Sequence, residues 1–512
     1  MALLNYLLAV LSGALLALSF PRYGHPAFAW IALVPLLVAL GPPGRREAAS
    51  TGRAFTLGLL TGLVYFVGTI YWTGAVLRTF GGLASPLAML AMLLLALYLA
   101  LYPALTALVM HRLLRRMGSE ALLIAPAVWV ATEYLRGYLF GGFPWVPLGN
   151  SQVSVLPVAQ LASVLGVYGL SALVAYVNSS LAYVLLARGR ARLAAGAAAL
   201  ATLAAVGGWG AWRIADGRLT REGTPIRIGL IQGNIAQEDK WNPREARRIF
   251  TTYIAMTRDA VRRGAEFVIW PESSTPFMFE EDPGGAAALR ALAREVQVPI
   301  LFGSDQVDRR GDVIRLYNAA FLLTPKGETG AVYRKIHLVP FGEYIPFKEW
   351  LYFVSPLVER LAEFAPGTSA VMLPVGEHAV NTAICYEVVY PSLIRDAVRA
   401  GSQLLTTITN DAWYGYSSAP YQHFELASMR AIEQGRYLAR SANTGISGIV
   451  DPYGRVVARS VLFEEVGLVA DARILNGRTI YAQIGDVVAY AAMVLVAAAL
   501  LVNGGRFGGR NR

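Results

Sequence analysis

The chain has 512 residues, of which 55% are hydrophobic and only 15% are charged, and its mean hydropathy is +0.45. Soluble chains carry roughly 25% charged residues, so this composition excludes a wholly soluble protein. It also excludes a disordered chain, because apolar and aromatic side chains offset the entropy cost of folding. The net charge of +11 comes almost entirely from arginines clustered between apolar runs, which indicates membrane topology rather than nucleic-acid binding.

Cysteine and histidine usage limits the chemistry that this chain can perform. Its single cysteine, Cys385, rules out an internal disulfide and any cluster of thiol ligands. The five histidines are scattered without the spacing of metal ligands. We therefore expect no metal and no other cofactor.

Eight apolar runs predict membrane-spanning helices, since only helices satisfy their own backbone hydrogen bonds in lipid. Seven precede residue 215 and one follows residue 481. The first lacks a basic flank and is followed at once by further apolar sequence, which favours an anchor over a signal peptide. The predicted spans are Leu3–Phe20, Phe28–Leu40, Phe55–Leu77, Leu87–Met110, Ala121–Phe140, Gln160–Leu186, Leu193–Ile214 and Ile484–Val502.

Arginines follow every second predicted span, and the alternate loops carry few of them. Under the positive-inside rule the basic loops and both termini are cytoplasmic, and residues 215–481 lie outside. We expect a membrane domain at 1–214, an extracytoplasmic domain at 215–481, and a final span with a cytoplasmic tail at 482–512. The clustered residues are Arg45, Arg46, Arg53, Arg112, Arg115, Arg116, Arg188, Arg190, Arg192, Arg506, Arg510 and Arg512.

The fifth predicted span carries two charged residues, Glu133 and Arg136, on one helical face. Charges in lipid are costly, so they form either an interior ion pair or a contact with lipid head groups, and the structural pair is favoured. Trp145 lies in the following outside loop. An interfacial aromatic anchor explains this tryptophan without any function.

From Pro225 onward, short apolar strands alternate with amphipathic helices, which predicts a layered α/β domain of mixed sheets. Polar residues follow three of the strands: Glu272, Lys335 and Cys385. Each alone has an ordinary interpretation, as a helix cap, a solvated lysine or a buried thiol. Together they supply a base, a cation for an oxyanion and a nucleophile. Spacing also allows a rival Cys385–His337 dyad.

Longer motifs surround these three residues. Trp270-Pro271-Glu272, Tyr333 to Glu343, Ile384-Cys385-Tyr386-Glu387 and Thr409 to Trp413 resemble the nitrilase (carbon–nitrogen hydrolase) superfamily, whose members fold as an α-β-β-α sandwich. With seven predicted spans before this domain and one after, the whole chain resembles the bacterial apolipoprotein N-acyltransferase family. The expected fold is a polytopic α-helical membrane domain of about eight spans plus a nitrilase-like sandwich.

The resemblance implies roles for eight residues. Cys385 would be the nucleophile, Glu272 the general base and acid, and Lys335 the oxyanion stabiliser. Glu343 would position the lysine and support the base. The remaining matches are Tyr386 and Glu387 beside the nucleophile, and Trp241 and Trp145 as aromatic residues near the substrate.

The resemblance also implies an activity. The chain would transfer an acyl group from a membrane phospholipid, through a Cys385 thioester, to the N-terminal amine of a diacylglyceryl-cysteine apolipoprotein. It would act as a monomer in the bacterial inner membrane, with its catalytic domain outside the cytoplasm. Two other interpretations are a membrane-anchored amidase or nitrilase acting on a small extracytoplasmic amide, and a transporter. The transporter interpretation predicts paired intramembrane charges, which are few here.

An apolar stripe at helical spacing follows Pro346. It favours neither of two structures, a lid dipping into the membrane interface or a buried core helix. Its members are Phe347, Trp350, Leu351, Val354, Leu357, Leu361 and Phe364.

Overall fold

The computed structural model describes residues 2–41, 50–310, 313–344 and 363–502, and the chain forms two compact units. The helical unit comprises Met1–Arg78, Ala84–Asp216 and Ile484–Arg512. The second, mixed unit comprises Gly217–Gln483 together with the short segment Thr79–Leu83. This segment connects two helices of the helical unit, yet its contacts lie with the mixed unit.

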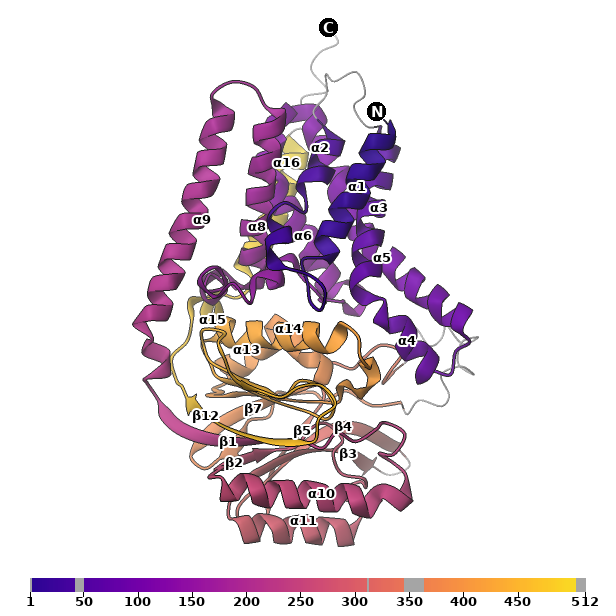
Figure 1. Cartoon of the computed structure of the whole chain (residues 1–512), viewed down its shortest axis with the longest axis vertical. Helices are drawn as coiled ribbons and strands as arrows, with labels where there is room; N and C mark the ends of the chain where they lie inside the picture. The colour runs from indigo at the N-terminus through magenta and orange to yellow at the C-terminus, as the bar shows by residue number, and fades with distance from the viewer. Residues whose placement is uncertain (1, 42–49, 311–312, 345–362, 503–512) are drawn as a thin grey trace. The chain divides into compact units, whose positions relative to one another are not determined.

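The helical unit contains a helix within every one of the eight predicted spans (Figure 1). Glycines allow α3 and α5 to pack closely: a Cβ atom on Gly58 would lie 2.5 Å from the Pro103 carbonyl oxygen, and one on Gly62 would lie 2.7 Å from Ala100 Cα. Small residues at such contacts are typical of helix packing in membranes. The helices are α1 (Ala2–Ala17), α2 (Val34–Leu40), α3 (Thr51–Ile70), α4 (Trp72–Thr79), α5 (Ser85–Met117), α6 (Ala125–Tyr138), α7 (Leu156–Ala159), α8 (Ala162–Leu186), α9 (Ala191–Asp216) and α16 (Val487–Val502).

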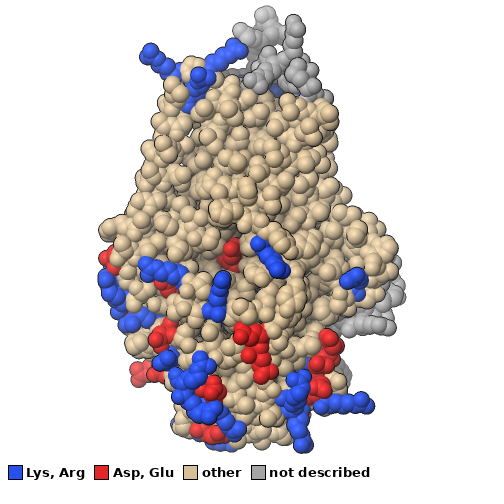
Figure 2. Space-filling model, viewed as in Figure 1, with Lys and Arg blue, Asp and Glu red and all other residues tan. Residues whose placement is uncertain are grey.

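Four helical stretches of the described residues are long and apolar enough to cross a membrane: Thr51–Ile70, Ser85–Gly141, Ala162–Leu186 and Ala191–Thr220. Shorter apolar helices cover Leu3–Ala17, Pro26–Leu40 and Val487–Val502. Figure 2 shows a broad, almost uncharged surface over the helical unit, with Lys and Arg gathered at one end. The helical unit therefore has the surface of a membrane region, whereas the count of eight spans stays a prediction.

Glu133 and Arg136 are both buried in the helical unit, and among the described residues they form no direct ion pair. Each instead holds the backbone of the loop that follows α6. Arg136 Nη1 donates to the carbonyl oxygens of Phe143 (2.9 Å) and Trp145 (2.6 Å), and Glu133 Oε1 accepts from the amide of Leu148 (2.7 Å). In place of the predicted ion pair, each of the two side chains makes its own hydrogen bonds to the loop backbone.

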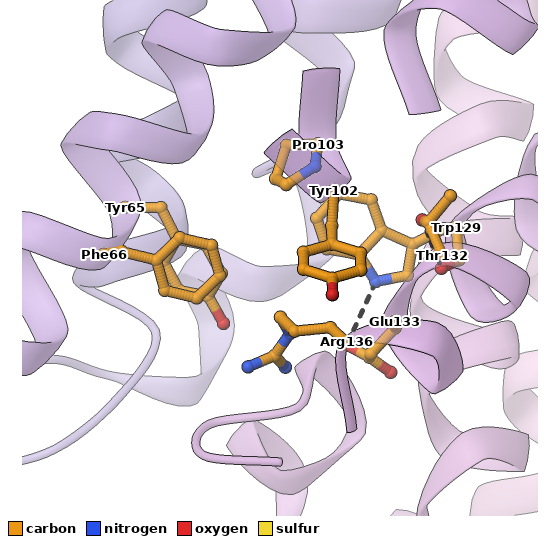
Figure 3. A pocket seen from close by; sticks show the side chains of 8 residues that line it. All are labelled: Tyr65, Phe66, Tyr102, Pro103, Trp129, Thr132, Glu133 and Arg136. Carbon is orange, nitrogen blue, oxygen red and sulfur yellow. Dashed lines mark hydrogen bonds between the residues drawn. The ribbon is translucent and has the colours of Figure 1, made fainter. Parts of the chain in front are cut away.

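A small pocket with room for about one water molecule lies between these side chains and the aromatic residues around them (Figure 3). Trp129 Nε1 donates to Glu133 Oε1 at 3.2 Å, the bond drawn in the figure, while Glu133 Oε2 has no hydrogen-bond partner among the described residues. The pocket is lined by Tyr65, Phe66, Tyr102, Pro103, Trp129, Thr132, Glu133 and Arg136.

Replacing Arg136 with methionine is expected to lower the free energy of unfolding by about 2–5 kcal/mol, because one buried and one partly buried carbonyl group lose a charged donor and Glu133 loses a nearby positive charge. Thermal unfolding of the purified protein in detergent measures the change. The control is Arg78→Met, at an exposed position on α4. Equal stability of the Arg136→Met variant and the wild type would contradict a stabilising role for the hydrogen bonds between Arg136 and the loop.

The mixed unit contains two six-stranded sheets, with strand orders β12-β1-β2-β3-β4-β5 and β11-β10-β9-β8-β7-β6. They pack against each other through β1 with β9 and β4 with β7. Figure 1 shows α10 and α11 covering the outer face of the first sheet and α13 and α14 covering that of the second. The predicted nitrilase-like sandwich of layers α-β-β-α is the observed architecture. The strands are β1 (Thr224–Gln232), β2 (Phe267–Ile269), β3 (Ile300–Arg310), β4 (Val313–Leu323), β5 (Thr329–Arg334), β6 (Leu373–Val375), β7 (His378–Ile384), β8 (Leu405–Thr409), β9 (Leu438–Ala442), β10 (Gly448–Val450), β11 (Val456–Arg459) and β12 (Val466–Ile474).

Local sequence explains where these elements begin. Helix α10 (Pro243–Arg262) starts after Asn242, whose side chain caps the helix by accepting from the Arg244 amide, and Pro243 supplies the first helical φ. Helix α11 (Pro283–Val296) starts in the same way after Asp282. The central parallel strands β2 and β8 are buried along their whole length, as expected for strands covered on both faces. The described residues of this unit also form α13 (Pro391–Arg399), α14 (Ala419–Gln434) and α15 (Ile480–Ile484).

Candidate active site

Cys385 follows β7 directly and opens a 3₁₀ turn, η7 (Cys385–Val389). Its φ is +52°, a left-handed conformation that side chains other than glycine seldom adopt and that clusters at functional sites. The residue is buried, and burial together with the Glu272 carboxylate raises the pKa of its thiol to about 12, although Lys335 acts in the opposite direction. The thiol is therefore protonated near neutral pH and needs a base before it can act as a nucleophile.

Glu272 follows β2, and both of its carboxylate oxygens are held in place. Oε1 accepts from Asn318 Nδ2 at 2.7 Å, and Oε2 accepts from the backbone amide of Asn410 at 2.9 Å. The chain approaches this turn closely at Gly303, where a Cβ atom would lie 2.7 Å from the Glu272 Cα. Only glycine fits beside the backbone of the Glu272 turn at this position.

Lys335 follows β5 and is buried, with its ammonium group against two carboxylates. Nζ lies 2.9 Å from Glu343 Oε1 and 3.6 Å from Glu272 Oε1. Burial by itself would lower the pKa of Lys335, but the charges of Glu343 and Glu272 raise it above its ordinary value. The lysine is therefore a fixed cation, which suits it to stabilise an oxyanion rather than to remove a proton.

Asn318, on β4, joins the two carboxylates. Its Nδ2 donates to Glu272 Oε1 and also to Glu343 Oε1, the latter at 2.9 Å. The other oxygen of Glu343 accepts from the Val339 amide at 2.8 Å. Glu343 therefore contacts Lys335 directly and Glu272 through Asn318, the position expected of a residue that orients both.

Glu387 connects the segment that carries the lysine to the strand that carries the cysteine. Oε1 accepts from the Tyr333 hydroxyl (2.8 Å) and from the amides of Ile336 (2.6 Å) and His337 (3.1 Å), and Oε2 accepts from the Ile384 amide (2.7 Å). Burial raises the pKa of Glu387 to about 7, while these donors favour its ionised form. Its role in this geometry is to fix the two strand ends relative to each other.

The other residues predicted from the sequence lie in different settings. Tyr386 is buried beside Cys385 and packs edge-on against Tyr390, whose ring centroid lies 3.8 Å from that of His337. Trp241 is 45% exposed in the loop before α10. Trp145 is fully buried in the helical unit against Trp72 rather than at an exposed interface. Of the apolar stripe after Pro346, only Phe364 lies within the described residues.

Two polar residues of this site escaped the sequence analysis. Asn318 lies directly before the buried apolar residues at the end of β4, and a polar residue at that place is the only local sign that could have identified it. Lys240 is buried, and its Nζ donates to the Glu272 backbone oxygen at 3.0 Å. Burial lowers the pKa of Lys240 to about 8. Lysines in polar loops are usually solvated, so nothing in the local sequence indicates that Lys240 is buried.

Comparison with known proteins agrees with this geometry. Residues 227–483 match the carbon-nitrogen hydrolase family, and residues 12–180 match the apolipoprotein N-acyltransferase N-terminal domain. An apolipoprotein N-acyltransferase of Geobacter metallireducens is 40% identical over 495 residues, which cover 95% of this chain and 93% of that protein. The chain belongs to the apolipoprotein N-acyltransferase family. It is an acyltransferase enzyme, as the match over nearly its full length shows.

Other members of the apolipoprotein N-acyltransferase family are also similar. The protein named so in Shewanella oneidensis is 34% identical over 98% of this chain and 95% of its own length. Among solved structures, an amidase from Nesterenkonia sp. aligns with a TM-score of 0.39 at 20% identity, over 53% of this chain and 97% of the amidase. The two family matches and the relatives aligned over nearly the whole chain confirm the sequence-based assignment to this family and to the carbon–nitrogen hydrolases.

Proposed function

We propose that the enzyme transfers an acyl chain from a membrane phospholipid to the N-terminal amine of a diacylglyceryl-cysteine apolipoprotein, through a thioester on Cys385. The observation that carries the proposal is the buried cluster in which Lys335 contacts both Glu272 and Glu343, together with the effect of Glu272 and Lys335 on the pKa of the single thiol. A base, a fixed cation and a nucleophile are the groups that acyl transfer requires.

In the first half-reaction, Glu272 takes the thiol proton while Cys385 Sγ attacks an ester carbonyl carbon of the phospholipid. Lys335 stabilises the oxyanion that develops on the carbonyl oxygen. The intermediate collapses, the ester C–O bond breaks, and Glu272 returns the proton to the departing lysophospholipid oxygen. The acyl chain stays on Cys385 as a thioester, so the kinetics are ping-pong.

In the second half-reaction, the neutral N-terminal amine of the acceptor attacks the thioester carbonyl. An α-amine has a pKa of about 7.7–8.0, so a useful fraction is neutral near pH 7. Glu272 accepts a proton from the attacking nitrogen, the C–S bond breaks, and Glu272 passes this proton to the leaving sulfur, which restores the thiol of Cys385. An amide replaces an ester, which is downhill, so the reaction needs no nucleotide and no cofactor.

The same proposal places the enzyme in the bacterial inner membrane with about eight spans. Residues 1–214 would form the membrane domain, 215–481 the extracytoplasmic catalytic domain, and 482–512 the last span and the tail. The arginine clusters after alternate spans support this orientation. We propose a monomer as the working unit.

The test incubates the purified full-length enzyme with phospholipid that carries a labelled acyl chain. We expect label on the wild-type protein that neutral hydroxylamine removes, as thioesters require, and no label on Cys385→Ala. Adding a diacylated lipopeptide should move the label to the peptide in a hydroxylamine-resistant amide. An unlabelled wild type, or label that persists on Cys385→Ala, would overturn the proposal. A membrane-anchored amidase would release ammonia from small amides and take up no label.

A further inference from the structure

A buried network of three polar side chains lies behind the nucleophile, and the proposed mechanism does not use it. His423 comes from α14, Asp411 from η8 (Asp411–Tyr414) after β8, and Arg440 from β9. All three side chains are fully buried. The energetic cost of burying so many polar groups favours a specific role for them.

The network ends on the backbone of the nucleophile. His423 Nε2 lies 3.2 Å from the carbonyl oxygen of Cys385. A carbonyl oxygen can only accept a hydrogen bond, so Nε2 must carry the proton that it donates. The other ring nitrogen, Nδ1, lies 3.0 Å from both Asp411 Oδ1 and Arg440 Nη2.

The two partners of Nδ1 keep that donor in place. When the imidazole is neutral, Nδ1 accepts from Arg440, and when it is charged, Nδ1 donates to Asp411. Nε2 is protonated in both cases. Asp411 Oδ2 and Arg440 Nη2 are 2.8 Å apart, and Thr409 Oγ1 donates to Asp411 Oδ1 at 3.0 Å, so the pair itself is firmly held. Although burial alone would raise the pKa of Asp411, Arg440 and His423 lower it to about 2, which keeps this carboxylate ionised.

The backbone that His423 contacts is strained, because Cys385 is left-handed at φ +52°. On its N-terminal side, Glu387 Oε2 holds the Ile384 amide at 2.7 Å. On its C-terminal side, His423 holds the Cys385 carbonyl. Contacts on both sides are what a sparsely populated conformation needs in order to persist.

We propose that His423 is a positioning residue for acyl transfer: by donating from Nε2 to the Cys385 carbonyl, it holds the nucleophile in the left-handed conformation that aims its sulfur at the substrate. Asp411 and Arg440 act through it by fixing the ring. The inference rests on Cys385 being the nucleophile of the proposed function.

Three substitutions separate this role from general stability. In His423→Gln the longer amide can still donate to the Cys385 carbonyl, and in His423→Asn the shorter amide keeps the Asp411–Arg440 contacts but does not reach the carbonyl. His423→Leu removes both. We expect the rate of Cys385 acylation to fall about tenfold or more in the Asn and Leu variants, to stay within about threefold of wild type in the Gln variant, and the KM for phospholipid to change little.

The matched control is Ser428→Ala on the same helix, whose hydroxyl bonds to the Phe424 carbonyl within α14 and to no other described residue. It should leave acylation unchanged. The proposal would be overturned if the acylation rate fell equally in the Gln and Asn variants, or if the Asn variant acylated at the wild-type rate. If the Leu variant fails to fold, the two polar variants alone decide between these outcomes. Alkylation of the single cysteine by iodoacetamide needs no lipid, and we expect its rate to rank the variants in the same order as acylation. Failure of the proposed function is distinguishable from failure of this inference, because the wild-type enzyme would then form no thioester with phospholipid.

Discussion

The Glu272→Gln variant is expected to transfer acyl groups about 10²–10⁴-fold more slowly than the wild type, the usual contribution of a general acid–base group. The thiol of Cys385 has a pKa of about 12, so its proton must leave during attack, and glutamine cannot accept it. The NH₂ group of the glutamine would also face another hydrogen-bond donor in either orientation of its side chain. Asn318 Nδ2 and the Asn410 amide donate to the two carboxylate oxygens of Glu272 that the glutamine replaces. Single-turnover labelling from phospholipid measures the loss.

The same substitution should make the resting thiol more acidic, because the negative charge of Glu272 raises the pKa of Cys385. At any pH well below that pKa, a larger fraction of Cys385 is then thiolate in the variant than in the wild type. Each unit by which the pKa falls increases this fraction tenfold. Alkylation by iodoacetamide reports on one site alone, since Cys385 is the only cysteine. Acyl transfer and alkylation should therefore change in opposite directions.

The matched control for Glu272 is Glu328→Gln, at an exposed position before β5, and it should change neither rate. A Glu272→Gln variant in which alkylation and acyl transfer fall together would contradict the assignment of Glu272 as the base. Such a result would mean that the substitution disorders the site instead of removing a proton acceptor.

The Lys335→Met variant is expected to lose about 10²–10³-fold in acyl-transfer rate, the typical cost of removing one oxyanion-stabilising group. It should also lower the free energy of unfolding by about 3–5 kcal/mol, because removing one partner leaves buried carboxylates uncompensated. Glu272 and Glu343 would then face each other with only Asn318 between them. Thermal unfolding and single-turnover labelling measure the two effects separately.

A double variant separates chemistry from stability. Adding Glu343→Gln to Lys335→Met removes one of the two uncompensated charges, so we expect stability to recover in part while activity stays low. Lys326→Met, in the exposed turn before β5, is the control and should match the wild type in both measurements. Recovery of activity in the double variant would contradict a direct role of Lys335 in stabilising the oxyanion.

Several features of this enzyme were predictable because they depend on neighbours along the chain. Apolar runs locate the helices, since the length of a span follows from the thickness of a bilayer. The strands before Glu272, Lys335 and Cys385 stand out as short apolar segments, and the motifs around the three residues carry the family resemblance. Glu343 and Glu387 also belong to these local motifs, so the sequence alone was enough to propose them as site residues.

Contacts between distant segments could not be predicted in the same way. Glu133 and Arg136 suggested an ion pair because they are three residues apart, but the loop backbone that each contacts competes successfully for both. Nothing near Asn318 indicates that it joins two carboxylates 46 and 25 residues away in the chain. Likewise, Thr79–Leu83 reads as a loop between membrane helices, yet it belongs to the mixed unit.

The amino-acid sequence by itself determined the class of protein, the order of its elements and the residue types of its chemistry, because hydropathy and short motifs are local properties. Only the tertiary structure decided how a buried carboxylate and a buried ammonium group affect the pKa of the thiol, and which residues contact the strained turn at Cys385. His423 reaches that turn from 38 residues away, and Arg440 supports it from a different strand. Such contacts depend on how the sheets and helices pack, and no pattern along the chain encodes them.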